Sequence, residues 1–318
     1  MKRILIALLA ALAPAVGFSQ AAFPQQPVRI VVPFGPGGLA DITMRLLGER
    51  MTPLLGKQVL IENMPGAGGV TAAMAVKKAK PDGHTLLVVV NGTAIAKSLF
   101  KQLPYDAQAD FAPVSLVTYF DLLVLAQPGR YATLKDLVAA AKANPGKLNF
   151  ATINPGSTQN LSALLFKSVA GIDVTVVPFK TSADAATAVI AGNADAVFES
   201  YAAMKGLVSG GRLKPLASTA TKSFGYLPNL PTVIEAGVPG YEVSGWNALA
   251  APAGTPADVI AILNRHVNTV ISQGDFKAKM LDSGTLAYAG TPEELRKQLA
   301  EDIAKWKAVI DKAGIPQQ

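Results

Sequence analysis

The sequence predicts an α/β protein in which strands alternate with helices over most of its 318 residues. Apolar runs such as Val28–Phe34 are followed by longer amphipathic segments such as Asp41–Leu55, the pattern of βαβ units with a parallel sheet. Half of the residues are hydrophobic, which is ample for a large core. At about 100–200 residues per domain, the length favours two domains.

The N-terminus has the features of a secretory signal peptide. A basic start is followed by an apolar run, Ile4–Val16, that is shorter than the roughly 20 residues needed to span a bilayer. The sequence Ser19-Gln20-Ala21 fits the small-x-small cleavage rule. We therefore expect a signal peptide over residues 1–21 and an exported mature chain that begins near Ala22, without a later membrane span.

The composition argues against several classes of protein. There is no cysteine, so disulfides, thiolate nucleophiles and cysteine-based metal sites are excluded. His84 and His266 lie in unrelated segments, so we expect neither a histidine metal site nor a Ser-His-Asp triad. The net charge of +7 is spread over helices without interleaved aromatic residues, which argues against nucleic acid, although it would attract an anionic solute.

The alternation of elements forms two series. The first series comprises strands 28–34, 58–61 and 85–90 and helices 41–55, 70–80 and 94–100. The second comprises strands 122–126, 148–152, 174–178, 194–199 and 216–219 and helices 134–143, 157–169 and 183–191. The Pro- and Gly-rich passage Phe224–Ala253 predicts a crossover without regular structure. Helices 256–273 and 292–313 close the chain, and Trp306 falls on the apolar stripe of the last one.

Three glycine-rich turns follow predicted strands: Gly35–Gly38, Pro65–Gly69 and Asn154–Thr158. The first and third open helices, whose N-terminal amides are unpaired and lie at the positive end of the helix dipole. Each of these turns can therefore bind a carboxylate through backbone donors. Ligand sites in open parallel sheets lie at the carboxyl ends of strands, where these turns stand. Two such turns facing across a cleft would suit a solute with a carboxylate at each end.

The same turns are compatible with other functions. The first turn also fits the GxGxxG/A pattern of dinucleotide-binding proteins, but an exported chain meets no pool of nicotinamide, and Pro33 and Pro36 stiffen the turn. We expect no cofactor and no bound metal. Ser157 and Thr158 either contact a ligand or only cap their helix. Asp41 either favours the helix dipole or orients the turn amides, a water or an amino group of the ligand.

The order of these motifs resembles one family of solute receptors. The segments PVRIVVPFGPGGLADITMRLL, NPGKLNFATINPGSTQNLSALLF and LPNLPTVIEAGVPGYEVSGWNALAAPAGTPADVI are similar to those of the Bug proteins, the periplasmic receptors of tripartite tricarboxylate transporters. The likeness runs through the whole mature chain. It implies a two-lobed periplasmic binding protein of type II, a Venus flytrap, in which each lobe is a mainly parallel sheet flanked by helices and a small carboxylate lies between the lobes.

The resemblance also implies which residues line the cleft. In the first lobe they are Phe34, Gly37, Gly38, Ala40 and Asp41, and in the second Thr152, Gly156, Ser157 and Thr158. Asn91, Thr93, Thr181, Ser182 and Glu199 are also placed to line it. Asn160 and Leu164 stand where the family commonly has His and Glu, and Phe179 and Thr181 where it has Tyr and Gly, so the identity of the ligand does not follow.

We therefore expect a monomeric periplasmic receptor, not an enzyme, that binds a small mono- or dicarboxylate by hinge closure and delivers it to a membrane transporter. Lobe 1 is expected at residues 22–122 plus 243–318 and lobe 2 at 123–242, with hinges near Phe120–Leu123 and Ser244–Trp246. Two alternatives stay open. One is an exported receptor that signals to a sensor kinase, and the other is an exported isomerase or hydrolase, for which Asp41 and Glu199 would have to act alone.

Overall fold

The computed structural model describes residues 23–221, 226–227 and 229–317. The predicted signal peptide, residues 1–21, lies outside this part of the chain. Among the described residues, no helix combines the length and the apolar character that crossing a membrane requires.

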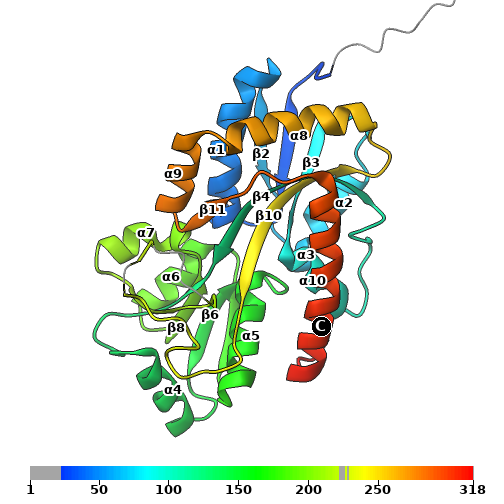
Figure 1. The fold of residues 1–318 in the computed structure, drawn as a ribbon. Helices are drawn as coiled ribbons and strands as arrows, with labels where there is room; N and C mark the ends of the chain where they lie inside the picture. The colour runs from blue at the N-terminus through cyan, green and yellow to red at the C-terminus, as the bar shows by residue number, and fades with distance from the viewer. Residues whose placement is uncertain (1–22, 222–225, 228, 318) are drawn as a thin grey trace, which may run out of the picture.

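Two β-sheets flanked by helices form the molecule (Figure 1), which confirms the predicted α/β class with two lobes. In lobe 1 the strand order is β11-β4-β10-β3-β1-β2, and in lobe 2 it is β7-β6-β8-β5-β9. The strands of lobe 1 are β1 (Val28–Val32), β2 (Val59–Asn63), β3 (Thr85–Val90), β4 (Phe111–Asp121), β10 (Ser244–Pro252) and β11 (Thr285–Ala287). Those of lobe 2 are β5 (Leu123–Ala126), β6 (Asn149–Ile153), β7 (Thr175–Phe179), β8 (Ala196–Glu199) and β9 (Lys214–Ser218).

The helices follow the same division. Those of lobe 1 are α1 (Leu39–Leu55), α2 (Val70–Lys77), α3 (Asn91–Leu99), α8 (Ala257–Ile271), α9 (Gly274–Asp282) and α10 (Pro292–Ala313), with the short 3₁₀ helix η1 (Ala67–Gly69). Those of lobe 2 are α4 (Leu134–Ala143), α5 (Thr158–Ala170), α6 (Ser182–Ile190) and α7 (Tyr201–Ser209). The predicted strands and helices are thus found, with ends that differ by a few residues.

Both sheets are more mixed than expected. β1 pairs in parallel with β2 and β3, and β6 pairs in parallel with β7 and β8. These are the predicted βαβ units. The pairings of β4, β10 and β11 in lobe 1 and of β5 with β8 and β9 in lobe 2 are antiparallel.

The prediction that Phe224–Ala253 has no regular structure is wrong over its last part. β10 occupies Ser244–Pro252 and pairs with both β3 and β4. Because β10 is buried from Gly245 onward, it lacks the alternation of apolar and polar residues that marks a half-exposed strand. β4, its neighbour, was not indicated by the sequence either, since it carries the polar residues Ser115 and Thr118 in fully buried positions.

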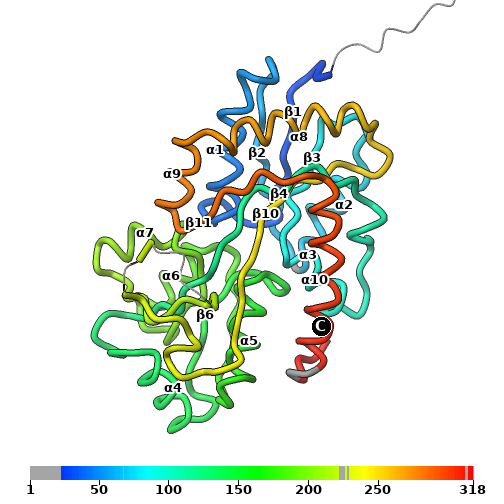
Figure 2. The backbone as a smooth tube through the Cα atoms, viewed as in Figure 1, coloured from blue at the N-terminus to red at the C-terminus, as the bar shows by residue number. Residues whose placement is uncertain are grey.

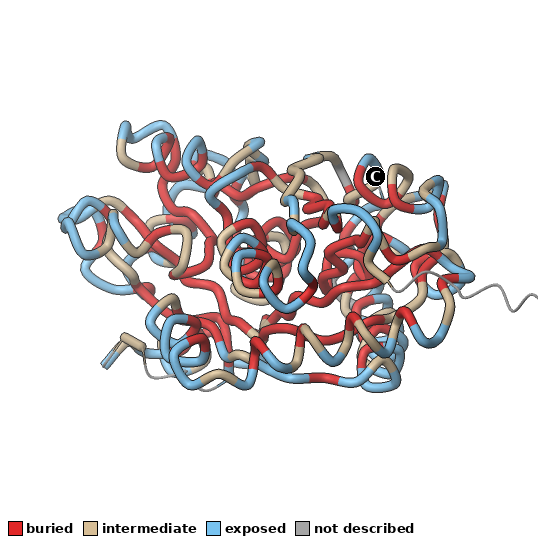
Figure 3. The backbone as a smooth tube through the Cα atoms, turned by 90° about the horizontal axis from the view of Figure 1, so that it is seen from above, coloured by how far each residue is buried: buried red, intermediate tan, exposed pale blue. Residues whose placement is uncertain are grey.

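Apolar cores cover both faces of the lobe 1 sheet. Along β1, Ile30 belongs to the cluster beneath α1 and α8, whereas Val31 belongs to a larger cluster on the opposite face. The larger cluster continues into lobe 2 as far as Phe150 and Phe198. α10 extends from β4 and α3 toward α5 (Figure 2) and contacts all three elements. Figure 3 shows the buried chain in the middle of the molecule and the exposed residues on the outer loops and helices.

Two chain crossings connect the lobes, one from β4 to β5 and one that enters β10. Thr219 joins them through four hydrogen bonds. Its backbone N–H donates to the Leu122 carbonyl (2.9 Å), and the Leu122 N–H donates to its Oγ1 (2.9 Å). The Val243 N–H donates to the Thr219 carbonyl (2.9 Å), and the Thr219 Oγ1 donates to the Val243 carbonyl (2.7 Å). A hinge role for these crossings stays a prediction.

The substitution Trp306→Ala tests the packing of α10. The Trp306 side chain is only 1% exposed. We expect Trp306→Ala to lower the free energy of unfolding by about 3–5 kcal/mol in urea titrations, because a large cavity would open beneath the helix. Lys307→Ala, on the exposed face of the same helix, should change it by no more than about 0.5 kcal/mol. Equal effects of the two substitutions would contradict the burial of α10.

Candidate functional site

A pocket lies between the lobes, at the carboxyl ends of β1, β3, β6 and β7. The empty space between its walls is about 410 Å³, and this volume includes the part of the pocket that is open to solvent. Its apolar wall consists of Phe34, Leu39, Val90, Phe120 and Ile153. Its polar wall consists of Thr158, Gln159, Lys180, Thr181, Ser182 and Asn247. No acidic side chain is among the described residues that line it, so the pocket is electrostatically suited to an anion.

Three helices begin at this pocket. α1 starts after Gly38, which caps it without a side-chain hydrogen bond. α5 starts after Ser157, whose Oγ accepts from the Asn160 N–H (3.0 Å), and α6 starts after Thr181. The first amides of a helix have no acceptor within it, and the helix dipole adds positive charge there. Two of these helices belong to lobe 2 and one to lobe 1, so both lobes direct backbone donors toward the pocket.

Asp41 holds the first turn in place from behind the pocket. Its Oδ2 accepts hydrogen bonds from the Gly37 N–H (2.9 Å) and Arg45 Nε (3.0 Å), and its Oδ1 accepts from Asn63 Nδ2 (2.9 Å). Burial alone would raise the pKa of this carboxyl, but the hydrogen bonds and the charge of Arg45 outweigh burial and lower the pKa. Asp41 is 3% exposed and does not line the pocket. Its hydrogen bond from the Gly37 N–H fixes the orientation of the turn.

Glu199 stands behind the lobe 2 wall in a similar position. It is fully buried and accepts hydrogen bonds from Gln159 Nε2 (2.9 Å) and Ser182 Oγ (2.7 Å), two groups that line the pocket. The Ser200 N–H also donates to it (2.7 Å). Burial raises the pKa of Glu199, and the hydrogen bonds from Gln159, from Ser182 and from both the N–H and the side chain of Ser200 only partly oppose this.

The lobes touch each other around the pocket. Thr158 Oγ1 donates a hydrogen bond to Asn91 Oδ1 from across the interface, and the Gly68 N–H donates to the Pro155 carbonyl (3.0 Å). The approach is so close that a side chain at Gly35 would place its Cβ 2.9 Å from Thr181 Cγ2. The structure therefore represents a state in which the two walls are in contact.

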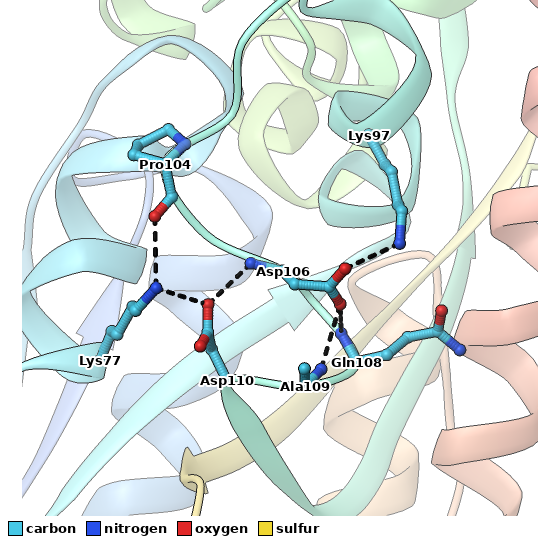
Figure 4. A network of polar contacts seen from close by, with 7 residues as sticks. All are labelled: Lys77, Lys97, Pro104, Asp106, Gln108, Ala109 and Asp110. Carbon is cyan, nitrogen blue, oxygen red and sulfur yellow. Dashed lines mark hydrogen bonds and ion pairs between the residues drawn. The ribbon is translucent and has the colours of Figure 1, made fainter.

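A polar network on lobe 1 supports one of these contacts (Figure 4). Lys77 Nζ pairs with Asp110 Oδ2 (2.8 Å), and Lys97 Nζ pairs with Asp106 Oδ2 (2.9 Å). These pairs hold the loop between α3 and β4, which carries Tyr105. The Tyr105 hydroxyl donates to the Gly68 carbonyl (2.8 Å) and so orients the peptide that meets lobe 2.

The structure places the predicted site residues in three groups. The pocket brings together Phe34, Gly38, Ala40, Thr158, Thr181 and Ser182. A smaller adjoining cavity is lined by Thr93, Gly156 and Ser157. Gly37, Asp41, Asn91, Thr152 and Glu199 line neither cavity, and each of them forms a hydrogen bond.

Three polar residues of the wall were not predicted. Gln159 follows Thr158 directly and could have been found from its position in the first turn of α5. Lys180 immediately precedes the predicted Thr181. Asn247 lies on β10, and its Nδ2 donates to Thr118 Oγ1 (3.0 Å) on β4. Since neither strand was predicted, no sequence signal placed Asn247 near the pocket.

Comparison with known proteins agrees with this geometry. Residues 43–315 match the model of the tripartite tricarboxylate transporter family receptor. Protein BugT of Bordetella pertussis is 32% identical over 295 residues, which cover 92% of this chain and 90% of BugT.

Two solved structures are similar to the whole fold. An R. palustris protein with adipate superposes with a TM-score of 0.90 and 32% identity, over 93% of this chain and 100% of that one. MatC from Rhodopseudomonas palustris with bound malate gives a TM-score of 0.86 and 35% identity, over 91% of this chain and 100% of MatC.

Asp41→Asn tests the hydrogen bonds that hold the first turn. The pKa of Asp41 is lowered in the folded state. At pH values above the pKa of an unfolded Asp, the ionised carboxylate therefore stabilises the fold. This stabilisation is lost as the pH falls through the folded pKa. At pH ~7 the substitution should lower the free energy of unfolding by about 1.5–3 kcal/mol. The difference in the free energy of unfolding between the wild type and Asp41→Asn should shrink at pH ~3. If urea titrations gave the same difference at every pH, the stabilising role of the ionised carboxylate would be contradicted.

Proposed function

The chain belongs to the tripartite tricarboxylate transporter receptor family, and we propose that it binds a small mono- or dicarboxylate in the pocket between its lobes. Members of this family are solute-binding receptors, not enzymes. The proposal rests on three helix N-termini, from both lobes, that meet around a pocket whose described wall residues include no acid. Backbone amides in that arrangement bind carboxylates without requiring a particular side chain.

Closure of the two lobes on the ligand is part of the proposal. A ligand shifts an open–closed equilibrium only by the difference in its affinity for the two states. A carboxylate that accepts hydrogen bonds from Ala40 on α1 and from Thr158 on α5 would meet both sets of donors only in the closed state. The relatives with adipate and malate support a carboxylate ligand, and their different lengths leave the choice of carboxylate open.

We place the lobe boundaries between residues 122 and 123 and between 242 and 243. The division of strands between the two sheets supports this, because β4 ends at Asp121 and β10 begins at Ser244. The hinges would then lie at Phe120–Leu123 and Ser244–Trp246, the segments next to the hydrogen bonds of Thr219.

The remaining steps of the proposed function rest on the family. Its receptors are periplasmic, and the basic, apolar N-terminus supports export of this chain by a signal peptide over residues 1–21. We propose that the loaded monomer delivers its ligand to the membrane subunits of a tripartite transporter. No observation on the described residues favours signalling to a sensor kinase instead.

A thermal-shift screen tests the class of ligand. The panel contains mono-, di- and tricarboxylates, including malate and adipate, each beside its neutral amide. A carboxylate at about 100 times its dissociation constant should stabilise the protein by about 2.7 kcal/mol and raise the melting temperature by about 5 °C. Stabilisation by a neutral amide with no response to any carboxylate would overturn the proposal.

Gly38→Val tests the first turn as a ligand donor. Gly38 has φ −82°, which any residue adopts, so the variant should fold. The new side chain would approach Ser182 Oγ, because even a Cβ at this position would lie 3.4 Å from it. We expect at least a roughly 100-fold loss of carboxylate affinity by calorimetry, equivalent to about 2.8 kcal/mol.

Gly274→Val is the matched control, since a Cβ at Gly274 on α9 would meet no atom within 4 Å. This variant should bind like the wild type. If Gly38→Val also kept its affinity, the first turn would be structural only.

A further inference from the structure

Glu199 is a buried acid without a cationic partner. Its carboxyl group is 0% exposed, and its only hydrogen-bond partners among the described residues are the neutral donors Gln159, Ser182 and Ser200. A buried carboxylate is normally compensated by a cation, because transfer of an unpaired charge out of water is very unfavourable. Glu199 also lies one hydrogen bond away from a pocket suited to anions, where a second negative charge would repel the ligand.

We propose that Glu199 is a positioning residue that carries a proton when an anionic solute occupies the pocket, so that solute binding takes up one proton from the solvent. The inference rests on the proposed function, since an anion in the pocket is what favours the neutral acid. Glu199 would act on the solute through Ser182 and Gln159 and would not touch it.

The hydrogen bonds identify the oxygen that receives the proton. Oε1 already accepts from Gln159 Nε2 (2.9 Å) and from the Ser200 N–H (2.7 Å). Oε2 accepts from Ser182 Oγ (2.7 Å). Of these partners, only a hydroxyl can reverse its direction and become an acceptor. The Ser182 hydroxyl bonds to Oε2 and lines the pocket, so the proton that couples to the solute is assigned to Oε2.

Protonation of Oε2 changes what the pocket offers to the ligand. The new O–H donates to Ser182 Oγ, and the hydrogen of the Ser182 hydroxyl is released from Glu199. Ser182 lines the pocket, so this hydrogen can be donated to an anion there. When Glu199 is ionised, the same hydrogen is held by Oε2 and the pocket has one donor fewer. Only one O–H bond forms, with a proton taken from water.

Among the described residues, no charged side chain forms a hydrogen bond or an ion pair with Glu199. The neighbouring strands β5 and β6 carry no ionisable side chain, and on α7 the adjacent Tyr201 is stacked on Tyr226. Lys180 lines the pocket itself. The charged groups on the packed helices have other partners: Asp184 on α6 binds Thr181, Lys167 on α5 pairs with Asp173, Lys205 on α7 pairs with Asp282, and Asp41 on α1 pairs with Arg45. Burial, which raises the pKa of Glu199, thus acts unopposed by a cation.

Calorimetry in buffers of different ionisation enthalpy tests the coupling, with malate and adipate as probes. Both probes are ionised between pH ~6.5 and ~9, so they contribute almost no protons themselves. The wild type should take up as much as one proton per ligand, and its affinity should fall by as much as about tenfold per pH unit above the pKa of Glu199 in the free protein.

Glu199→Gln is the decisive variant. Its amide can keep an oxygen toward Gln159 and Ser200 and direct Nε2 to Ser182, which reproduces the neutral acid. Proton uptake should disappear, and the affinity should stay near the low-pH value of the wild type at every pH. Glu235→Gln, in the same lobe and hydrogen-bonded to Thr232, should keep the uptake of the wild type.

A second measurement needs no ligand. If the pKa of Glu199 is raised by folding, ionisation disfavours the folded state, so the wild type loses stability as the pH rises from about 4.3 through the folded pKa. Glu199→Gln should lack this loss. Urea titrations over pH should therefore show a gap between the two proteins that widens with pH.

The outcomes separate the two proposals. Binding of malate or adipate without proton uptake at any pH overturns the coupling and leaves the receptor function intact. More than a tenfold loss of affinity in Glu199→Gln at low pH overturns it too, because the ionised carboxylate would then be what the site needs. If none of the carboxylates in the screen binds to the wild type, the proposed function fails and the coupling fails with it.

Discussion

The first backbone amides of α1, α5 and α6, which have no acceptor within their own helices, are the constraint on which the rest of the site depends. An amide withdrawn from solvent needs an acceptor, and these three helix ends share one pocket. Their dipoles act together there, so an anion is favoured over a cation. The close approach of these helix ends also explains why glycine occupies the first turn, because a side chain at Gly35 or Gly38 would meet the opposite lobe.

The topology explains why helix ends from separate lobes can meet. In each lobe, parallel strands place helix N-termini at the carboxyl edge of the sheet. The antiparallel strands β4 and β10 lead from one sheet to the other, and Thr219 holds the two crossings together. β4 and β10, which contribute antiparallel pairs to the lobe 1 sheet, are therefore also the strands at which the chain passes between the lobes.

The βαβ units and the glycine turns could be predicted from sequence, because each turn joins a short apolar run to an amphipathic helix. β4 and β10 could not, since buried strands with polar residues such as Ser115 and Asn247 show no alternation. Asp41 and Glu199 were predicted to be site residues, but the pattern could not show that both stand behind the wall. Their positions follow from tertiary hydrogen bonds to Asn63 and Ser182, which local spacing does not encode.

The central claim, that a carboxylate draws the lobes together by contacting both, is tested most directly by a distance measurement. The natural chain has no cysteine, so Lys57→Cys on lobe 1 and Lys142→Cys on lobe 2, both exposed, would carry the only two spin labels. Pulsed electron paramagnetic resonance should show a broad distribution of distances without ligand and a shorter, narrower one with bound malate or adipate. An unchanged distribution on binding would contradict the account.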